Sequence, residues 1–150
     1  MSNMFPLYAF LAGVVVAQVM KPLVLALFGQ PFDFKLMFAS GGYPSSHSAG
    51  AVSLALACGL KDNFDSTSFA LATALACFIC YDAANVRYYS GRNIELTKHI
   101  VEDMRKHGLN LIDPIYDEKI KQVLGHKWSE VLCGIIIGLI TAWILYLFLG

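Results

Sequence analysis

The segment from Val131 to Leu149 is an uninterrupted apolar run. It holds 19 residues without a charge, and Thr141 is its only strongly polar member. That length falls within the roughly 17–25 residues that a helix needs to cross a bilayer. Hydrophobic residues make up 57% of the 150-residue chain and charged residues only 15%, and a surface with that much apolar area would aggregate unless lipid covered it. We therefore expect an integral membrane protein.

Three further apolar segments complete a set of four expected spans, near residues 4–20, 45–60, 66–82 and 130–149. The two middle segments are short, and a start inside the membrane is an alternative for one of them. In a second alternative, the middle segments are re-entrant and only two helices cross. The predicted fold class is an all-α, small polytopic transmembrane bundle of about four spans, with residues 1–150 in a single domain.

Positive charges gather on one side of this arrangement. Ten of the eleven Lys and Arg residues fall on one side of the four expected spans, and Lys61 falls on the other. Positively charged loops stay in the cytoplasm, so loop 87–127 is expected there. Within it, Asn93–His107 is expected to form a helix that stops at Gly108 and lies on the membrane surface or over the bundle, and 118–124 a second, short helix. A formal net charge of zero excludes nucleic-acid binding by bulk positive charge.

The four cysteines and the pair Gly134 and Gly138 are interpreted as residues that pack helices together. The four cysteines all lie in apolar segments, where a thiolate metal site is costly and a free Cys behaves as a small hydrophobe. We therefore expect no metal. Gly134 and Gly138 form a G-x-x-x-G pattern that permits close helix approach, either within the bundle or between subunits of a homo-oligomer.

A polar turn opens the second apolar segment, from Gly41 to Ser48. Pro44 breaks the chain, and Ser45 or Ser46 can cap the helix that follows. The backbone N–H groups at such a helix start, with the positive end of its dipole, form an anion site. His47 adds a titratable donor there. The alternative is an ordinary Ser-capped helix with an interfacial His.

A second polar string opens the last apolar segment. His126 and Glu130 are four residues apart, hence on one helical face. A carboxylate bonded to one imidazole nitrogen fixes the tautomer and leaves the other nitrogen basic, which prepares a nucleophilic His. The alternative is a surface pair at the level of the headgroups.

Topology is expected to bring the two strings to the same face of the membrane. Lys21 ends the first span on that face, and Asp82 and Arg87 follow the third. Arg87 and Lys21 are suited to phosphate oxygens, and Asp82 to orienting one of the cations or a His. Two histidines, two cations and an anion-binding helix end suit phosphoryl transfer, where positioning and charge stabilisation supply most of the catalysis.

These strings resemble a known family. Pro44-Ser45-Ser46-His47 and His126-x3-Glu130-Val131-x2-Gly134 resemble two motifs of the type-2 phosphatidic acid phosphatases, a superfamily that includes vanadium-dependent haloperoxidases. The match to its divergent membrane branch is closer and extends over residues 10–145. It is carried by Gln18-x2-Lys21, Gly-Gly-Tyr-Pro-Ser-Ser-His-Ser-Ala, Tyr81-Asp82-Ala83, Val86-Arg87, Ile100-Val101-Glu102-Asp103 and Leu124-Gly125-His126.

The resemblance implies a role for each candidate. His126 would be the nucleophile that forms a phosphohistidine, Glu130 its orienting carboxylate, and His47 the acid that protonates the leaving alcohol. Ser45, Ser46, Lys21 and Arg87 would hold the phosphate. No metal or other cofactor is required in this scheme.

The departures from the main family keep a rival function open. Where that family has Arg-Pro seven residues after its Lys, this chain has Phe28, and Glu130 replaces an Asp. The leading hypothesis is a membrane phosphatase acting on a lipid phosphate or prenyl (pyro)phosphate at the cytoplasmic leaflet. The alternative is a non-catalytic membrane protein that binds phosphate headgroups or a partner. A transporter is a third candidate, disfavoured because the polar residues cluster at one face.

Overall fold

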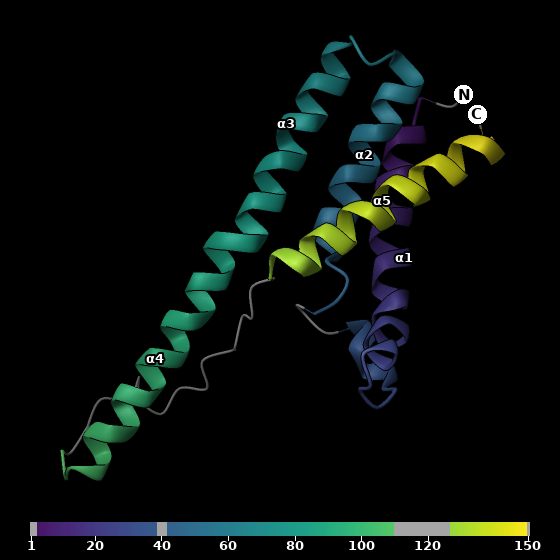
Figure 1. Ribbon diagram of the computed structural model, residues 1–150. Coiled ribbons are helices and arrows are strands. Elements are labelled where there is room, and N and C mark those ends of the chain that lie inside the picture. Colours follow the sequence, from purple (N-terminus) through teal and green to yellow (C-terminus); the bar gives the residue numbers. More distant parts are fainter. Residues whose placement is uncertain (1–2, 39–41, 110–126, 150) are drawn as a thin grey trace.

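The chain folds into helices that lie side by side in a bundle (Figure 1). The computed structural model describes residues 3–38, 42–109 and 127–149, without the side chain of Arg87. Its elements are α1 (Phe5–Leu27), the 3-10 turn η1 (Phe34–Phe38), α2 (Ser46–Asp62), α3 (Thr67–Tyr81), the π-helical turn η2 (Asp82–Val86), α4 (Arg87–Lys106) and α5 (Trp128–Leu149). The described ranges contain helices and no strand, so the predicted all-α helical bundle is confirmed.

Helix α1 is longer than the expected span 4–20. It continues through Lys21 and Pro22 and ends at Leu27. Two residues later, Gly29 adopts a positive φ of 80°. The N–H of Gln30 donates to the carbonyl of Leu25 at 3.1 Å, which closes the last turn. A proline removes one bond from a helix interior but does not always end it. Lys21 is therefore inside a helix and not in a loop.

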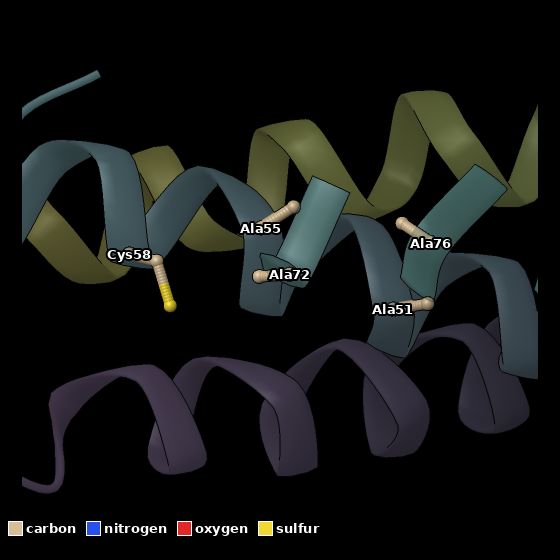
Figure 2. Close-up of a cluster of buried hydrophobic side chains, with 5 residues drawn as sticks. All are labelled: Ala51, Ala55, Cys58, Ala72 and Ala76. Atoms are coloured by element: carbon tan, nitrogen blue, oxygen red, sulfur yellow. The ribbon is translucent and has the colours of Figure 1, made fainter. Parts of the chain in front are cut away.

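Helix α2 is the centre of the bundle, and it packs against α1, α3 and α5. Its buried side chains are small, which lets neighbouring backbones approach closely. Figure 2 shows the cluster that joins α2 to α3. Ala51, Ala55 and Cys58 of α2 are buried together with Ala72 and Ala76 of α3. The residues that α2 buries are thus Ala, Gly, Ser and Cys, while Phe5 of α1 and Val131 and Ile137 of α5 are the larger buried apolar residues of the core.

The large apolar side chains point outward instead. Leu11 and Val15 of α1, Leu71 of α3 and Ile136 of α5 are each between 50% and 67% exposed. A water-soluble protein does not expose contiguous apolar surface of this kind, whereas lipid covers it at no cost. The arrangement of small residues inside and large residues outside therefore identifies a membrane protein.

Among the described residues, three helices are long and apolar enough to cross a membrane: α1, the continuous helix Thr67–Lys106 and α5. Helix α2 has 17 residues, which at 1.5 Å per residue gives about 25 Å against a hydrocarbon core of about 30 Å. Whether α2 starts inside the membrane stays a prediction, and so does the number of crossings.

Helices α3 and α4 form one continuous helix through η2, and α4 extends away from the other helices (Figure 1). The expected stop is confirmed, because α4 ends at Lys106 and Gly108 has a φ of 81°. The expected start at Asn93 is wrong, because the helix enters from α3 without a break. The bundle does not cover the apolar face of α4, since Leu96 is 59% exposed. The helix expected at 118–124 lies outside the described residues.

The G-x-x-x-G pattern packs within the chain. A Cβ atom on Gly134 would collide with the carbonyl oxygen of Ser45, and one on Gly138 with that of Ala49. The hydroxyl of Ser53 donates to the carbonyl of Gly138 at 2.8 Å, a second link between α2 and α5. Of the two alternatives for this pattern, the structure supports packing inside the bundle.

Replacing Gly134 with Ala should lower the free energy of unfolding by about 1–3 kcal/mol, because the colliding atom is backbone and α5 must move away from α2. Thermal unfolding of detergent-purified protein, followed by the fluorescence of Trp128 and Trp143, measures the change. Leu132→Ala is the matched control on the same helix, since Leu132 is 56% exposed. Equal melting temperatures for Gly134→Ala and wild type would contradict the close contact.

Candidate functional site

Three helices converge at one end of the bundle. Ala17 of α1, Ala49 of α2 and Ile137 of α5 form one buried cluster. One helical turn further along, α1 presents Lys21 and α2 is capped by Ser45. The backbone N–H of Ser45 donates to the carbonyl of Glu130 at 3.1 Å, so the start of α5 is joined to the same point. Lys21, Ser45 and Glu130, far apart in sequence, are thereby brought together.

Ser45 caps α2, as expected from the sequence. Its side-chain oxygen accepts from the N–H of Ser48 at 3.4 Å and from the hydroxyl of Ser48 at 3.0 Å. Ser45 and Ser48 are fully buried, and Ser46 is 9% exposed. The first turn of a helix carries N–H groups without intrahelical partners and the positive end of the dipole. Hydroxyls, N–H groups and dipole together suit an anion such as phosphate.

Two opposite charges are buried beside this helix start. Lys21 is only 2% exposed and Glu130 9%. The ammonium of Lys21 and the carboxylate of Glu130 attract each other electrostatically, which offsets part of the cost of removing them from water. A buried cation beside this helix start would add positive charge where phosphate would bind, while Glu130 would supply a nearby acceptor for a histidine N–H.

His47 and Asp82 lie on the wall of one cavity of about 420 Å³. His47 comes from the first turn of α2 and its side chain is exposed, whereas Asp82 opens η2 and is half-buried. Ser46 lies on the same wall, and the remainder is mostly apolar. Ligand sites typically have this composition, a largely apolar pocket with a few polar groups.

The π turn explains how Asp82 reaches this cavity. A π-helical turn inserts one extra residue, and such turns occur frequently at functional sites. Here it buries Ala83 and Ala84 against Val131 of α5, and Asp82 and Ala83 line the cavity beside α2. Asp82 thus lines the same cavity as His47, and its supporting role stays a prediction.

Two predicted residues fall outside this description. His126 lies outside the described residues, so its pairing with Glu130 stays a prediction. Arg87 is the first residue of α4, but its side chain is not described. Of the eight predicted site residues, Lys21, Ser45 and Glu130 are brought to one point and Ser46, His47 and Asp82 to the adjoining cavity.

Sequence reasoning quoted two further polar residues near the site in its motifs but assigned them no role. Ser48 is fully buried and bonded to Ser45, and the Ser-Ser-His-Ser string was the available signal. Gln18 lies one turn before Lys21, and its amide oxygen is buried with no hydrogen-bond partner among the described residues. Within those residues, no three potential metal ligands come together.

Fold and site together define a class: a small helical membrane protein with an anion-suited helix start beside a buried cation. Residues 2–141 match the Divergent PAP2 family, and the chain belongs to this family. It is 30% identical over 150 residues to a Bacillus subtilis (strain 168) protein named "Uncharacterized membrane protein YuiD", covering 96% of this chain and 95% of that one. No solved structure matches the chain. The resemblance to the divergent branch that the motifs indicated is thereby confirmed.

Proposed function

We propose that this protein is a membrane phosphatase that hydrolyses a lipid phosphate or a prenyl (pyro)phosphate through a phosphohistidine. The observation that carries the proposal is the convergence of Lys21, Ser45 and Glu130 at the start of α2. These residues combine an anion-suited helix start with a buried cation. The cavity beside them is lined by His47. Membership in the Divergent PAP2 family supports the same chemistry.

The proposed reaction has two steps. The phosphate lies against the N-terminus of α2, held by Ser45, Ser46 and the charge of Lys21. A ring nitrogen of His126 forms a bond to phosphorus while the bond to the leaving oxygen breaks, and His47 gives its proton to that oxygen, so that the alcohol leaves, or the prenyl monophosphate where the substrate is a pyrophosphate. Water then attacks the phosphohistidine, His47 accepts the proton from water, and inorganic phosphate and free His126 are restored.

Glu130 and Asp82 act in this proposal through the histidines. Glu130 accepts a hydrogen bond from the second ring nitrogen of His126 and stabilises the positive charge that develops there. Asp82, on the same cavity wall as His47, keeps His47 protonated before the first step. Arg87 supplies a second cation to the phosphate oxygens. The charged residues of α4 lie at this same end of the bundle, which supports a site at the cytoplasmic leaflet.

The test is phosphate release by the purified protein in detergent or nanodiscs, from a panel of phosphatidate, lysophosphatidate and prenyl mono- and diphosphates. We expect release from at least one class and inhibition by vanadate, which mimics the five-coordinate phosphorus. Binding of these phosphates without release would favour the non-catalytic alternative. The phosphatase proposal fails if no member of the panel is hydrolysed.

His47→Asn should lower kcat for alkyl phosphates by about 10²–10⁴-fold, since an alkoxide is a poor leaving group without a proton donor. The loss should be far smaller for an aryl phosphate such as nitrophenyl phosphate, whose leaving group is already stable as an anion. His99→Asn, at an exposed position on α4, is the matched control. A similar loss with both substrates would contradict the assignment of His47 as the acid.

A further inference from the structure

The cavity beside His47 continues away from its polar end into an apolar groove. Phe10 and Val14 of α1 form one side, and Phe78 and Ile79 of α3 form the other. We infer that this groove binds one hydrocarbon chain of a phosphorylated amphiphile, with the phosphate held at the Ser46–His47 end. The inference rests on the proposed function, because it names the substrate feature that the same site selects.

The polarity of the groove changes along its length. Helices α1 and α3 run in the same direction, so Phe10 and Val14 lie deeper in the bundle than Lys21, and Phe78 and Ile79 lie deeper than Asp82. From Val14 to Lys21 the helix rises about 10 Å. The polar lining residues, Ser46, His47 and Asp82, are all at the shallow end. This arrangement matches an amphiphile with its head at the surface and its chain directed inward.

The base of the groove is shaped by a glycine. Gly50 lies one turn beyond Ser46 on α2, and a Cβ atom there would collide with Val14 and crowd the ring of Phe10. Val14 and Phe10 can therefore pack directly onto the backbone of α2. Substitution at Val14 is consequently the most direct way to change the space inside the groove.

The surroundings of the groove favour a lipid chain as its occupant. Phe78, which lines the groove, is 74% exposed, so one wall of the groove belongs to the apolar outer surface that lipid covers. A chain can enter sideways from the bilayer without leaving an apolar environment. The volume of about 420 Å³ lies in the range of ligand pockets, about 300–1,000 Å³.

Photolabelling tests the occupant directly. The probe is a long-chain alkyl phosphate with a diazirine in mid-chain, added to the full chain in nanodiscs, and labelled residues are found by peptide mass spectrometry. We expect labels on the Phe10–Val14 and Phe78–Ile79 stretches, and a loss of about tenfold in Val14→Trp, because an indole displaces several buried methylenes. Val15→Trp, which places the same group toward lipid, is the matched control and should keep the wild-type labelling.

A second variant keeps the test informative if Val14→Trp does not fold. Phe78→Ala removes one wall at an exposed position, and Leu71→Ala, 67% exposed on the same helix, is its control. Labelling should fall several-fold in Phe78→Ala alone. Labels spread evenly over the lipid-facing surfaces of α1, α3 and α5, and unchanged in both groove variants, would overturn the inference.

Kinetic measurements separate this inference from the proposed function. They also show which class of lipid supplies the hydrocarbon chain. Val14→Trp should raise KM for long-chain phosphates by about tenfold more than it raises KM for a short, water-soluble alkyl phosphate. Groove labelling without hydrolysis by the wild type would contradict the phosphatase proposal and support chain binding in the groove. Hydrolysis with the same chain-length dependence in Val14→Trp and wild type would contradict chain binding in the groove and support the phosphatase proposal. Parallel assays with single-chain prenyl phosphate and diacyl phosphatidate show which lipid supplies the chain.

Discussion

Replacing His126 with Ala should abolish phosphate release, with a fall in kcat of about 10⁴–10⁶-fold. Loss of a covalent nucleophile has an effect of this size in other enzymes, and only binding and charge stabilisation remain. The expected result is that the variant still binds lipid phosphate, because the start of α2 and Lys21 are unchanged. Phosphate release and lipid binding are measured on the same preparation.

Two controls make this experiment specific. His99→Ala removes an exposed histidine of α4 and His107→Ala the exposed histidine that caps its end, and both should keep the wild-type rate. A rapid acid-free quench with radiolabelled substrate should trap phosphate on the wild-type protein, as a linkage that is stable in base and lost in acid, and none on His126→Ala. Equal rates of release for wild type and His126→Ala would refute the phosphohistidine.

The helices could be predicted from the sequence because their signals are local. Ser45 and Ser66 accept from the N–H three residues later and start α2 and α3, and Gly108 follows the end of α4 as expected. The end of α1 could not be predicted in this way. Lys21 and Pro22 suggest a boundary, but the helix continues because the surrounding bundle accepts both side chains, which are buried.

The site could be predicted only as a set of residues on one face. The strings around Ser45 and Glu130 were recognised, but their direct backbone link depends on the close approach of α5 to α2 that Gly134 permits. The groove depends on three helices together, and the π turn that brings Asp82 to it has no simple sequence signature. Tertiary contacts of this kind are decided by packing and not by local propensity.

The buried charges produce the second large effect that we expect. Lys21→Met should lower the free energy of unfolding by about 3–5 kcal/mol, because Met fills the space of the side chain but leaves the carboxylate of Glu130 buried without its cation. Thermal unfolding in detergent measures this loss. The matched control is Lys106→Met, which breaks the exposed pair of Lys106 and Asp103 at 3.3 Å and should cost less than about 1 kcal/mol.

A double-mutant cycle separates the interaction of the two charges from the loss of either side chain. Glu130→Gln alone should also destabilise the protein, since it leaves Lys21 buried with a neutral partner. The double variant Lys21→Met with Glu130→Gln should be more stable than the sum of the two single losses predicts, because neither charge is then left alone. Strictly additive losses would show that the two charges do not support each other. The cost of such a pair beside the proposed anion site, where two apolar side chains could pack as well, supports a role for both charges in the proposed chemistry.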